Sequence, residues 1–179
     1  MDFSPTHPQI IAAIVAMIAM YTDLKWGRIY NWLTFPAIFT GWALNLAIYG
    51  MPGLAYSVAA TLLGIFIYIP FALFGLMGMG DVKLLGAIGA LGGSYFVFSV
   101  FLYTSALGTL HAVLIQLLNY GKNAFSMLLT SFSTGIFLQK TIKKENETTA
   151  KEGKYRFLLG IDIFIATLIA IYHTFIITL

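Results

Sequence analysis

The chain has 179 residues, of which 59% are hydrophobic and only 9% are charged, against about 25% charged residues in soluble domains. This composition excludes an ordinary soluble domain and predicts one polytopic, all-α membrane domain over residues 1–179. The net charge of +3 comes mainly from short polar loops, so we interpret it as a topology signal and expect no nucleic-acid partner. The chain has no cysteine, which excludes disulfides, thiolate zinc sites and cysteine nucleophiles.

Apolar stretches in chain order predict six membrane-spanning helices. No basic residue precedes the first stretch, so we expect a membrane helix there and not a signal peptide. The polar segment "DLKWGRIYN" separates the first two spans, and the uncharged segments "GMPG" and "GGS" form later turns. The predicted spans are Pro8–Thr22, Trp32–Tyr49, Leu54–Leu76, Asp81–Leu91, Tyr95–Tyr120 and Phe157–Leu179.

The fourth span is unusually short. Counted from Asp81 to Leu91, it gives about 16 Å of helix, roughly half the thickness of the hydrocarbon core. The segment "GMGD", residues 78–81, breaks the chain just before it. Non-helical backbone at membrane depth is tolerated where protein buries it or water reaches it, so we expect this segment to line a hydrated site.

The basic residues predict the orientation of the chain. Lys25 and Arg28 lie in the first loop, Lys83 follows the "GMGD" break, and the others lie within residues 121–156. Six spans with both termini outside place all of these residues on the cytoplasmic side. Residues 121–156 are then a charged cytoplasmic loop, and its first part could form an interfacial helix.

Two aspartates fall at the same predicted membrane depth. Asp23 closes the first span and Asp81 opens the fourth, 58 positions later. An acid in a membrane segment is costly and therefore suggests a functional site, and two neighbouring acids commonly share one proton. Such a pair can activate water for peptide hydrolysis. Gly78 and Gly80, which lack a Cβ, would let an extended peptide approach.

A purely structural interpretation of the same acids stays open. Asp81 could simply cap the N-terminus of the fourth helix, and Asp23 could pair with Lys25 or Arg28 at the interface. Lys83 could stabilise the negative charge of the acidic pair or contact a substrate. It could equally reach the cytoplasmic interface from the fourth helix, and the residues favour that structural role slightly.

Two segments carry a resemblance to a known family. "DLKWGRIYNWLTFPAIFTGWALN" followed by "GMGDVKLLGAIGALGG" resembles the paired signature of the prepilin peptidases, which are membrane aspartyl proteases, in their short form. The resemblance implies that Asp23 and Asp81 form the catalytic pair, without metal or cofactor. It also implies removal of a short basic leader from prepilin, pseudopilin or preflagellin precursors, whose hydrophobic helix lies in the lipid, at the inner face of the cytoplasmic membrane.

The chain departs from that family at three places. The family commonly has Pro-Asn where this chain has Tyr30 and Asn31, although Asn31 can still cap a helix. The cysteine-rich segment of the long members is missing, so N-methyltransferase activity is not implied. The entry to the last helix reads "YRFLLGID" in place of a segment with proline and glycine.

Two polar residues in the later spans have no assigned role. His111 could relay a proton, but intramembrane polar residues more often serve packing between helices. Asp162 could bind the basic leader, tune the acidic pair, or face the interface near Lys154 and Arg156. The sequence leaves these alternatives open.

Other function classes fit the sequence less well. A presenilin or signal-peptide-peptidase type of protease also uses a GxGD aspartate, but it normally needs more spans and a Pro-Ala-Leu motif, which this chain lacks. A proton-coupled carrier could use the same acids, yet we find no internal repeat. The three histidines lack H-E-x-x-H spacing, which argues against a zinc protease.

Overall fold

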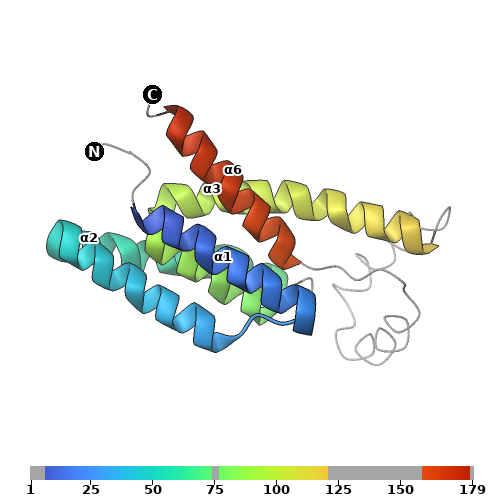
Figure 1. Ribbon diagram of the computed structural model, residues 1–179, viewed down its shortest axis with the longest axis horizontal. Helices are drawn as coiled ribbons and strands as arrows, with labels where there is room; N and C mark the ends of the chain where they lie inside the picture. The colour runs from blue at the N-terminus through green and yellow to red at the C-terminus, as the bar shows by residue number, and fades with distance from the viewer. Residues whose placement is uncertain (1–6, 74–76, 121–158, 178–179) are drawn as a thin grey trace.

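The computed structural model describes residues 7–73, 77–120 and 159–177, and all regular secondary structure within them is helical. The helices are α1 (His7–Trp26), α2 (Asn31–Leu73), α3 (Met79–Tyr120) and α6 (Leu159–Ile177) (Figure 1). All four are long and apolar enough to cross a membrane, by length and composition. The prediction of an all-helical membrane protein is thus confirmed. The predicted loop 121–156, with its interfacial helix, lies outside the described residues.

The first helix ends later than the sequence predicts. We expected its last residue at Thr22, but α1 continues for another turn to Trp26. It stops at Gly27, whose φ of 64° is the left-handed conformation that commonly ends helices. The N–H of Gly27 donates to the carbonyl of Asp23 at 2.7 Å. Asp23 therefore lies inside the last turn of α1 and not beyond it.

The chain of α2 reverses at Gly50. This residue has φ 68° and ψ −156°, outside the helical region and accessible mainly to glycine. Trp42 Nε1 donates to Thr61 Oγ1 at 3.0 Å, although these residues would lie about 28 Å apart in a straight helix. The turn falls in "GMPG", where the sequence predicts one.

A second reversal occurs inside α3 at Gly93, which has φ 83°. Residues on either side of Gly93 meet at Gly64 of α2, where a Cβ would lie 2.6 Å from the carbonyl oxygen of Leu85 and 3.1 Å from Val97 Cγ2. A straight helix would separate Leu85 from Val97 by about 18 Å. The first segment of α3 spans residues 79–92, slightly longer than the predicted Asp81–Leu91.

The helices approach one another through small residues. In α1, Ala12, Ala16 and Ala19 are fully buried, and α1 packs against α6. Between α2 and α3, a Cβ on Gly89 would lie only 2.4 Å from the carbonyl oxygen of Ala60. Membrane helices associate through such close contacts because no hydrophobic driving force acts between helices surrounded by lipid.

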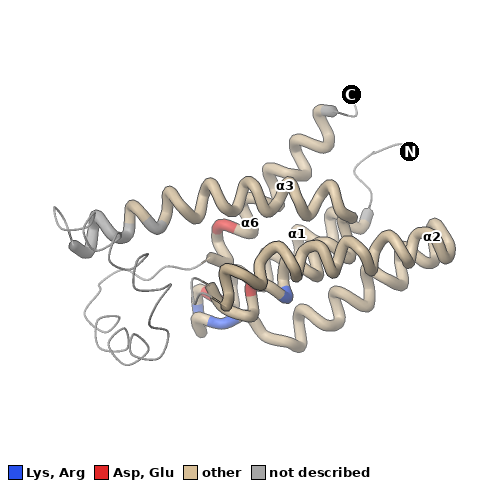
Figure 2. The backbone as a smooth tube through the Cα atoms, turned by 180° about the vertical axis from the view of Figure 1, so that it is seen from behind, with Lys and Arg blue, Asp and Glu red and all other residues tan. Residues whose placement is uncertain are grey.

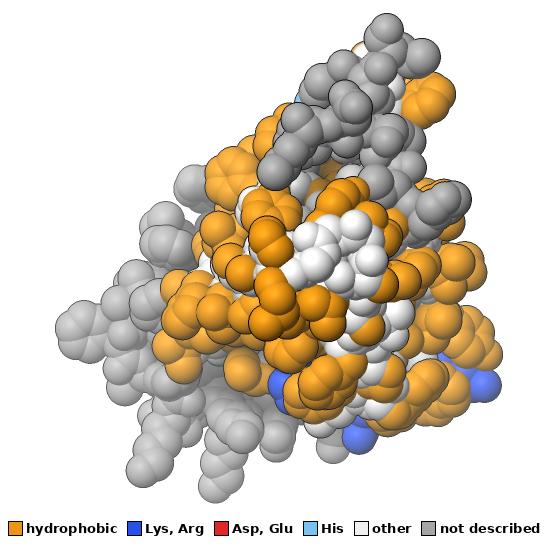
Figure 3. All heavy atoms as spheres, turned by 90° about the vertical axis from the view of Figure 1, so that its left-hand side faces the viewer, with side chains coloured by type: hydrophobic (Ala, Val, Ile, Leu, Met, Phe, Trp, Pro, Cys, Tyr) orange, Lys and Arg blue, Asp and Glu red, His pale blue; other side chains and the backbone are white. Residues whose placement is uncertain are grey.

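The outer surface is strongly apolar. Many of its exposed side chains are large and hydrophobic, and they include Phe39, Phe66 and Tyr172. Seen from the left-hand side of Figure 1, hydrophobic side chains dominate the surface (Figure 3). Charged residues of the described helices gather instead at one end of the bundle (Figure 2). The fold thus brings the end of α1, the starts of α2, α3 and α6, and the end of α2 to one polar region.

Candidate active site

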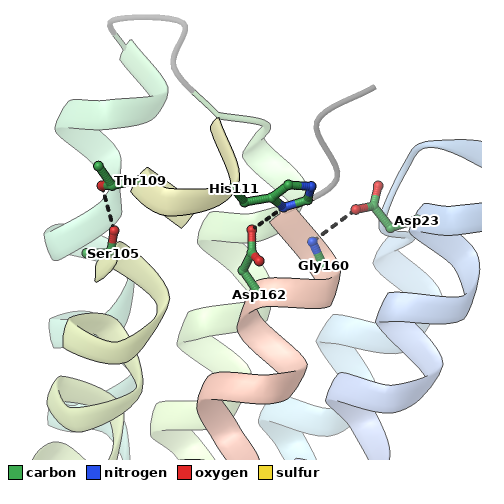
Figure 4. Close-up of polar contacts among 6 residues, drawn as sticks. All are labelled: Asp23, Ser105, Thr109, His111, Gly160 and Asp162. Atoms are coloured by element: carbon green, nitrogen blue, oxygen red, sulfur yellow. Dashed lines mark hydrogen bonds and ion pairs between the residues drawn. The ribbon is translucent and has the colours of Figure 1, made fainter. Parts of the chain in front are cut away.

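Asp23 binds the start of a distant helix. Its side chain is largely buried, with the residue 8% exposed, and Oδ2 accepts a hydrogen bond of 3.0 Å from the N–H of Gly160 (Figure 4). Gly160 is the second residue of α6, and N–H groups of a first helical turn have no acceptor within their own helix. Asp23 of α1 therefore caps the N-terminus of α6.

Gly160 is a site residue that the sequence analysis missed. A Cβ at this position would lie 2.9 Å from Asp23 Oδ2 and 3.0 Å from Asp23 Cβ, so a larger residue would push the Asp23 carboxyl group aside. The residue contributes a backbone donor and no side chain. The glycine in "YRFLLGID" was the available signal, but nothing in the sequence indicated which residue it faces.

Asp81 lies in the first turn of α3 and closes that turn. Its Oδ2 accepts the N–H of Gly78 at 3.1 Å, while its own N–H donates to the Gly78 carbonyl at 3.1 Å. This reciprocal arrangement resembles a capping box, with an acid at the third helical position. The capping role considered for Asp81 is therefore real. It uses one oxygen of a group that has two, so capping leaves room for a further role.

The two acids interact although they are distant in sequence. The charge of Asp23 is among those that act on the carboxyl group of Asp81, and the acidic residues of the described helices lie toward one end of the bundle (Figure 2). Asp81 is partly buried, and its neighbours Gly78 and Met79 are exposed. The acidic pair therefore lies near the protein surface, on the side of the first turn of α3.

Lys25, in the last turn of α1, does not pair with Asp23. Lys25 Nζ lies 4.7 Å from the ring centroid of Trp26 and 3.4 Å from the hydroxyl of Tyr21, to which it donates. Among the residues that the structure describes, none forms an ion pair with Asp23. The interfacial pairing with Lys25 or Arg28 is therefore not observed.

The two glycines of the motif differ in their surroundings. A Cβ on Gly80 would lie 3.0 Å from the Cβ of Ile29 and 3.2 Å from its carbonyl oxygen. The bare backbone of Gly80 thus accommodates the first loop of the same chain. Gly78 is exposed, and a Cβ there would approach only Asp81 Oδ2 closely, at 3.3 Å. Of the pair, Gly78 is the one with an open approach.

Lys83 and Asn31 form a contact between the starts of α3 and α2. Lys83 Nζ donates to Asn31 Oδ1 at 2.9 Å and lies 5.3 Å from the ring centroid of Phe35. Asn31 is the first residue of α2, and the carbonyl of Tyr30 receives the first backbone bonds of that helix. Lys83 and Asn31, which we expected to shape the site or to bind the substrate, thus bind each other.

His111 and Asp162, whose roles the sequence left open, face each other. His111 Nδ1 lies 3.0 Å from Asp162 Oδ2 (Figure 4). Asp162 is in the first turn of α6, two residues after Gly160. Its side chain is 7% exposed, against 25% for His111. Lys154 and Arg156, considered as partners of Asp162, lie outside the described residues.

Tyr68 is a second site residue that the sequence analysis missed. It is 1% exposed and within electrostatic range of both Asp81 and Asp162. One of ten tyrosines in the chain, it could not be singled out by composition. Its position near the end of α2 places a phenol near the acids of α3 and α6.

Comparisons with known proteins identify the family. A model of the type IV leader peptidase family matches residues 10–113, a region that contains Asp23, Asp81 and the whole "GMGD" segment. Searches of curated proteins and of solved structures gave no significant match. The matched region is more than half of the chain, and it supports a protease over the carrier considered above. The chain therefore belongs to the type IV leader peptidase family.

Proposed function

We propose that the chain is an aspartic endopeptidase that removes the short basic leader from type IV pilin-like precursors. Asp23 and Asp81 would be its catalytic residues. The observation that carries this proposal is the electrostatic influence of Asp23 on Asp81, an acid 58 positions further along the chain. The family match supports a leader peptidase, and no other acidic pair of this kind occurs among the described residues.

The proposed chemistry uses the two carboxyl groups as an acid and a base. The pair holds one proton, because two neighbouring carboxylates resist full ionisation. The ionised member takes a proton from water, whose oxygen attacks the scissile carbonyl carbon, while the protonated member donates to the carbonyl oxygen. The tetrahedral intermediate then collapses, the C–N bond breaks, and the leaving nitrogen receives the proton taken from water.

The arrangement of the helices supports a specific topology. We propose six spans, generated by the reversals at Gly50 and Gly93, with both termini outside. The acids then lie at the cytoplasmic face of the inner membrane, at the end of the bundle where the described Lys and Arg residues also gather (Figure 2). A pilin-like precursor would present its basic leader on this side and keep its hydrophobic helix in the lipid.

Substitution of each acid tests the proposal. Asp23→Asn and Asp81→Asn preserve shape and remove the ionisable group, so each should abolish processing of a co-expressed pilin-like precursor, seen as loss of the size shift on a gel. Lys25→Gln is the matched control, because it changes a charge two residues from Asp23 whose side chain contacts Tyr21 and Trp26. It should process normally. Processing by either Asn variant at wild-type rate refutes the proposal.

A further inference from the structure

The contact between His111 and Asp162 joins α3 to α6 beside the acidic pair. The ring nitrogen Nδ1 and the carboxyl oxygen Oδ2 are 3.0 Å apart, which is within hydrogen-bonding distance. The Asp162 side chain is 7% exposed. A carboxylate so enclosed and already bound is poorly placed to receive a basic leader. We therefore infer the role of Asp162 from its contact with His111 of α3.

The first turn of α6 also carries the donor that binds Asp23. Gly160 and Asp162 are two residues apart, so one helical turn makes both contacts, to α1 through the Gly160 N–H and to α3 through the Asp162 carboxylate (Figure 4). The space between Gly160 and Asp23 has little tolerance, because a Cβ on Gly160 would lie 2.9 Å from Oδ2. A small shift of this turn would therefore change the orientation of the Asp23 carboxyl.

Further along α6, the ring of His173 lies 6.3 Å from that of Tyr103 in α3, and several buried residues pack through apolar contacts. They include Ile163, Ala166 and Ala170, and such packing is not directional. The hydroxyl of Thr167 donates to the Ile163 carbonyl of its own helix, so it does not link α6 to a neighbour. A hydrogen bond between membrane helices, in contrast, holds the two helices in one rotation and register.

We propose that Asp162 and His111 are positioning residues. By anchoring the first turn of α6 to α3, they hold the Gly160 N–H on Asp23 and so fix the position of that carboxyl group. This inference rests on the proposed catalytic role of Asp23. The competing interpretation is a pair that contributes only to packing, which would affect stability without a specific effect on the chemical step.

Kinetics of the purified protein in liposomes distinguish the two interpretations. Asp162→Ala and His111→Ala should each lower kcat about tenfold or more with KM little changed, since misplacing a catalytic group by about 1 Å can cost roughly a hundredfold. The double variant should be no worse than the worse single variant, because both remove one contact. Asp162→Asn, which keeps an acceptor oxygen, should recover part of the rate.

Thr109→Val is the matched control on α3. Thr109 is exposed and its hydroxyl donates to the Ser105 carbonyl within the same helix at 2.7 Å (Figure 4), so its loss should leave kcat within twofold. An unchanged kcat in Asp162→Ala overturns the inference. So does a raised KM at constant kcat, because that result would indicate contact with the substrate.

A cross-linking experiment tests the anchor without relying on activity. The chain contains no cysteine, and an ideal Cβ on Gly160 lies 3.0 Å from the Cβ of Asp23, near the separation of about 3.8 Å in disulfides. A variant that carries both Asp23→Cys and Gly160→Cys should cross-link rapidly under mild oxidation. Adding Asp162→Ala should slow the reaction severalfold, and adding Asp162→Asn should slow it less. An unchanged rate with both added variants overturns the positioning role.

The two proposals fail in different ways. If Asp23→Asn retains activity, the catalytic assignment of Asp23 is wrong, whatever the cross-linking shows. If Asp23→Asn is inactive but the cross-link is insensitive to Asp162, the function stands and the anchor does not. A slower cross-link together with a lower kcat supports both.

Discussion

Asp23 of α1 accepts a hydrogen bond from the backbone of Gly160 in α6, 137 residues further along the chain. This contact couples the orientation of an acid in the first helix to the position of the last helix. The family match ends at residue 113, so the donor lies beyond the matched region. The site is therefore assembled from both ends of the chain.

Gly160→Ala should impair the chemical step more than stability. The new methyl group would lie 2.9 Å from Asp23 Oδ2, and the carboxyl or the helix must move away. Overpacking costs typically about 1–3 kcal/mol, whereas displacement of a catalytic group can cost far more in rate. We expect kcat for precursor cleavage to fall at least tenfold, with a fall in the thermal midpoint of only a few degrees. Wild-type kcat in this variant would show that the contact is not needed.

Two substitutions of Asp81 separate its capping role from its proposed catalytic role. Asp81→Asn keeps an oxygen that can accept the Gly78 N–H, as Asp81 Oδ2 does at 3.1 Å in the native protein. Stability should therefore change little while cleavage is lost. Asp81→Ala removes the cap as well, and it should destabilise the protein by a further ~1 kcal/mol. Thermal unfolding in detergent, run beside the cleavage assay, measures both effects. If Asp81→Asn cleaves normally and only Asp81→Ala is impaired, Asp81 is a capping residue alone.

The sequence predicted the individual acids and turns because each is a local signal. Asp23 and Asp81 stand out as charges beside apolar runs, and both reversals fall within glycine-containing segments, at Gly50 and Gly93. The end of α1 was misplaced by four residues, because Asp23 and Lys25 suggested a loop. Those residues continue the helix to the left-handed Gly27.

The partners of the acids could not be predicted in the same way. The Gly160 donor is a backbone group with no side-chain signature. His111 and Asp162 are 51 positions apart on helices whose rotation is set by packing, and each had several credible partners in the sequence. Such pairings depend on how helices from distant parts of the chain are arranged, which composition and spacing do not encode.

Lys83 and Asn31 test whether the contact beside the acids is structural. Their hydrogen bond of 2.9 Å is exposed, so its loss should cost at most about 1 kcal/mol. Lys83→Gln and Asn31→Ala should therefore both leave cleavage within severalfold of wild type, and the double variant should resemble either single one. If Lys83→Gln raises KM markedly while Asn31→Ala does not, Lys83 contacts the substrate.

The two reversal glycines provide a matched pair of substitutions. Both have positive φ, 68° at Gly50 and 83° at Gly93, so alanine at either position is strained by about 1–3 kcal/mol. Space around them differs: a Cβ on Gly50 approaches only Pro52 Cδ at 3.9 Å, while one on Gly93 would lie 2.7 Å from the ring of Tyr56.

Gly93→Ala should therefore lower the thermal midpoint more than Gly50→Ala. Tyr56 is also tied to this turn, because its hydroxyl accepts from Ser94 Oγ at 2.7 Å and cannot move away without losing that bond. Adding Tyr56→Ala, which vacates the space, should recover part of the stability lost in Gly93→Ala and none of that lost in Gly50→Ala. Equal thermal midpoints for the two alanine variants would show that backbone strain alone determines the loss of stability. The ring of Tyr56 would then move aside without an energetic cost.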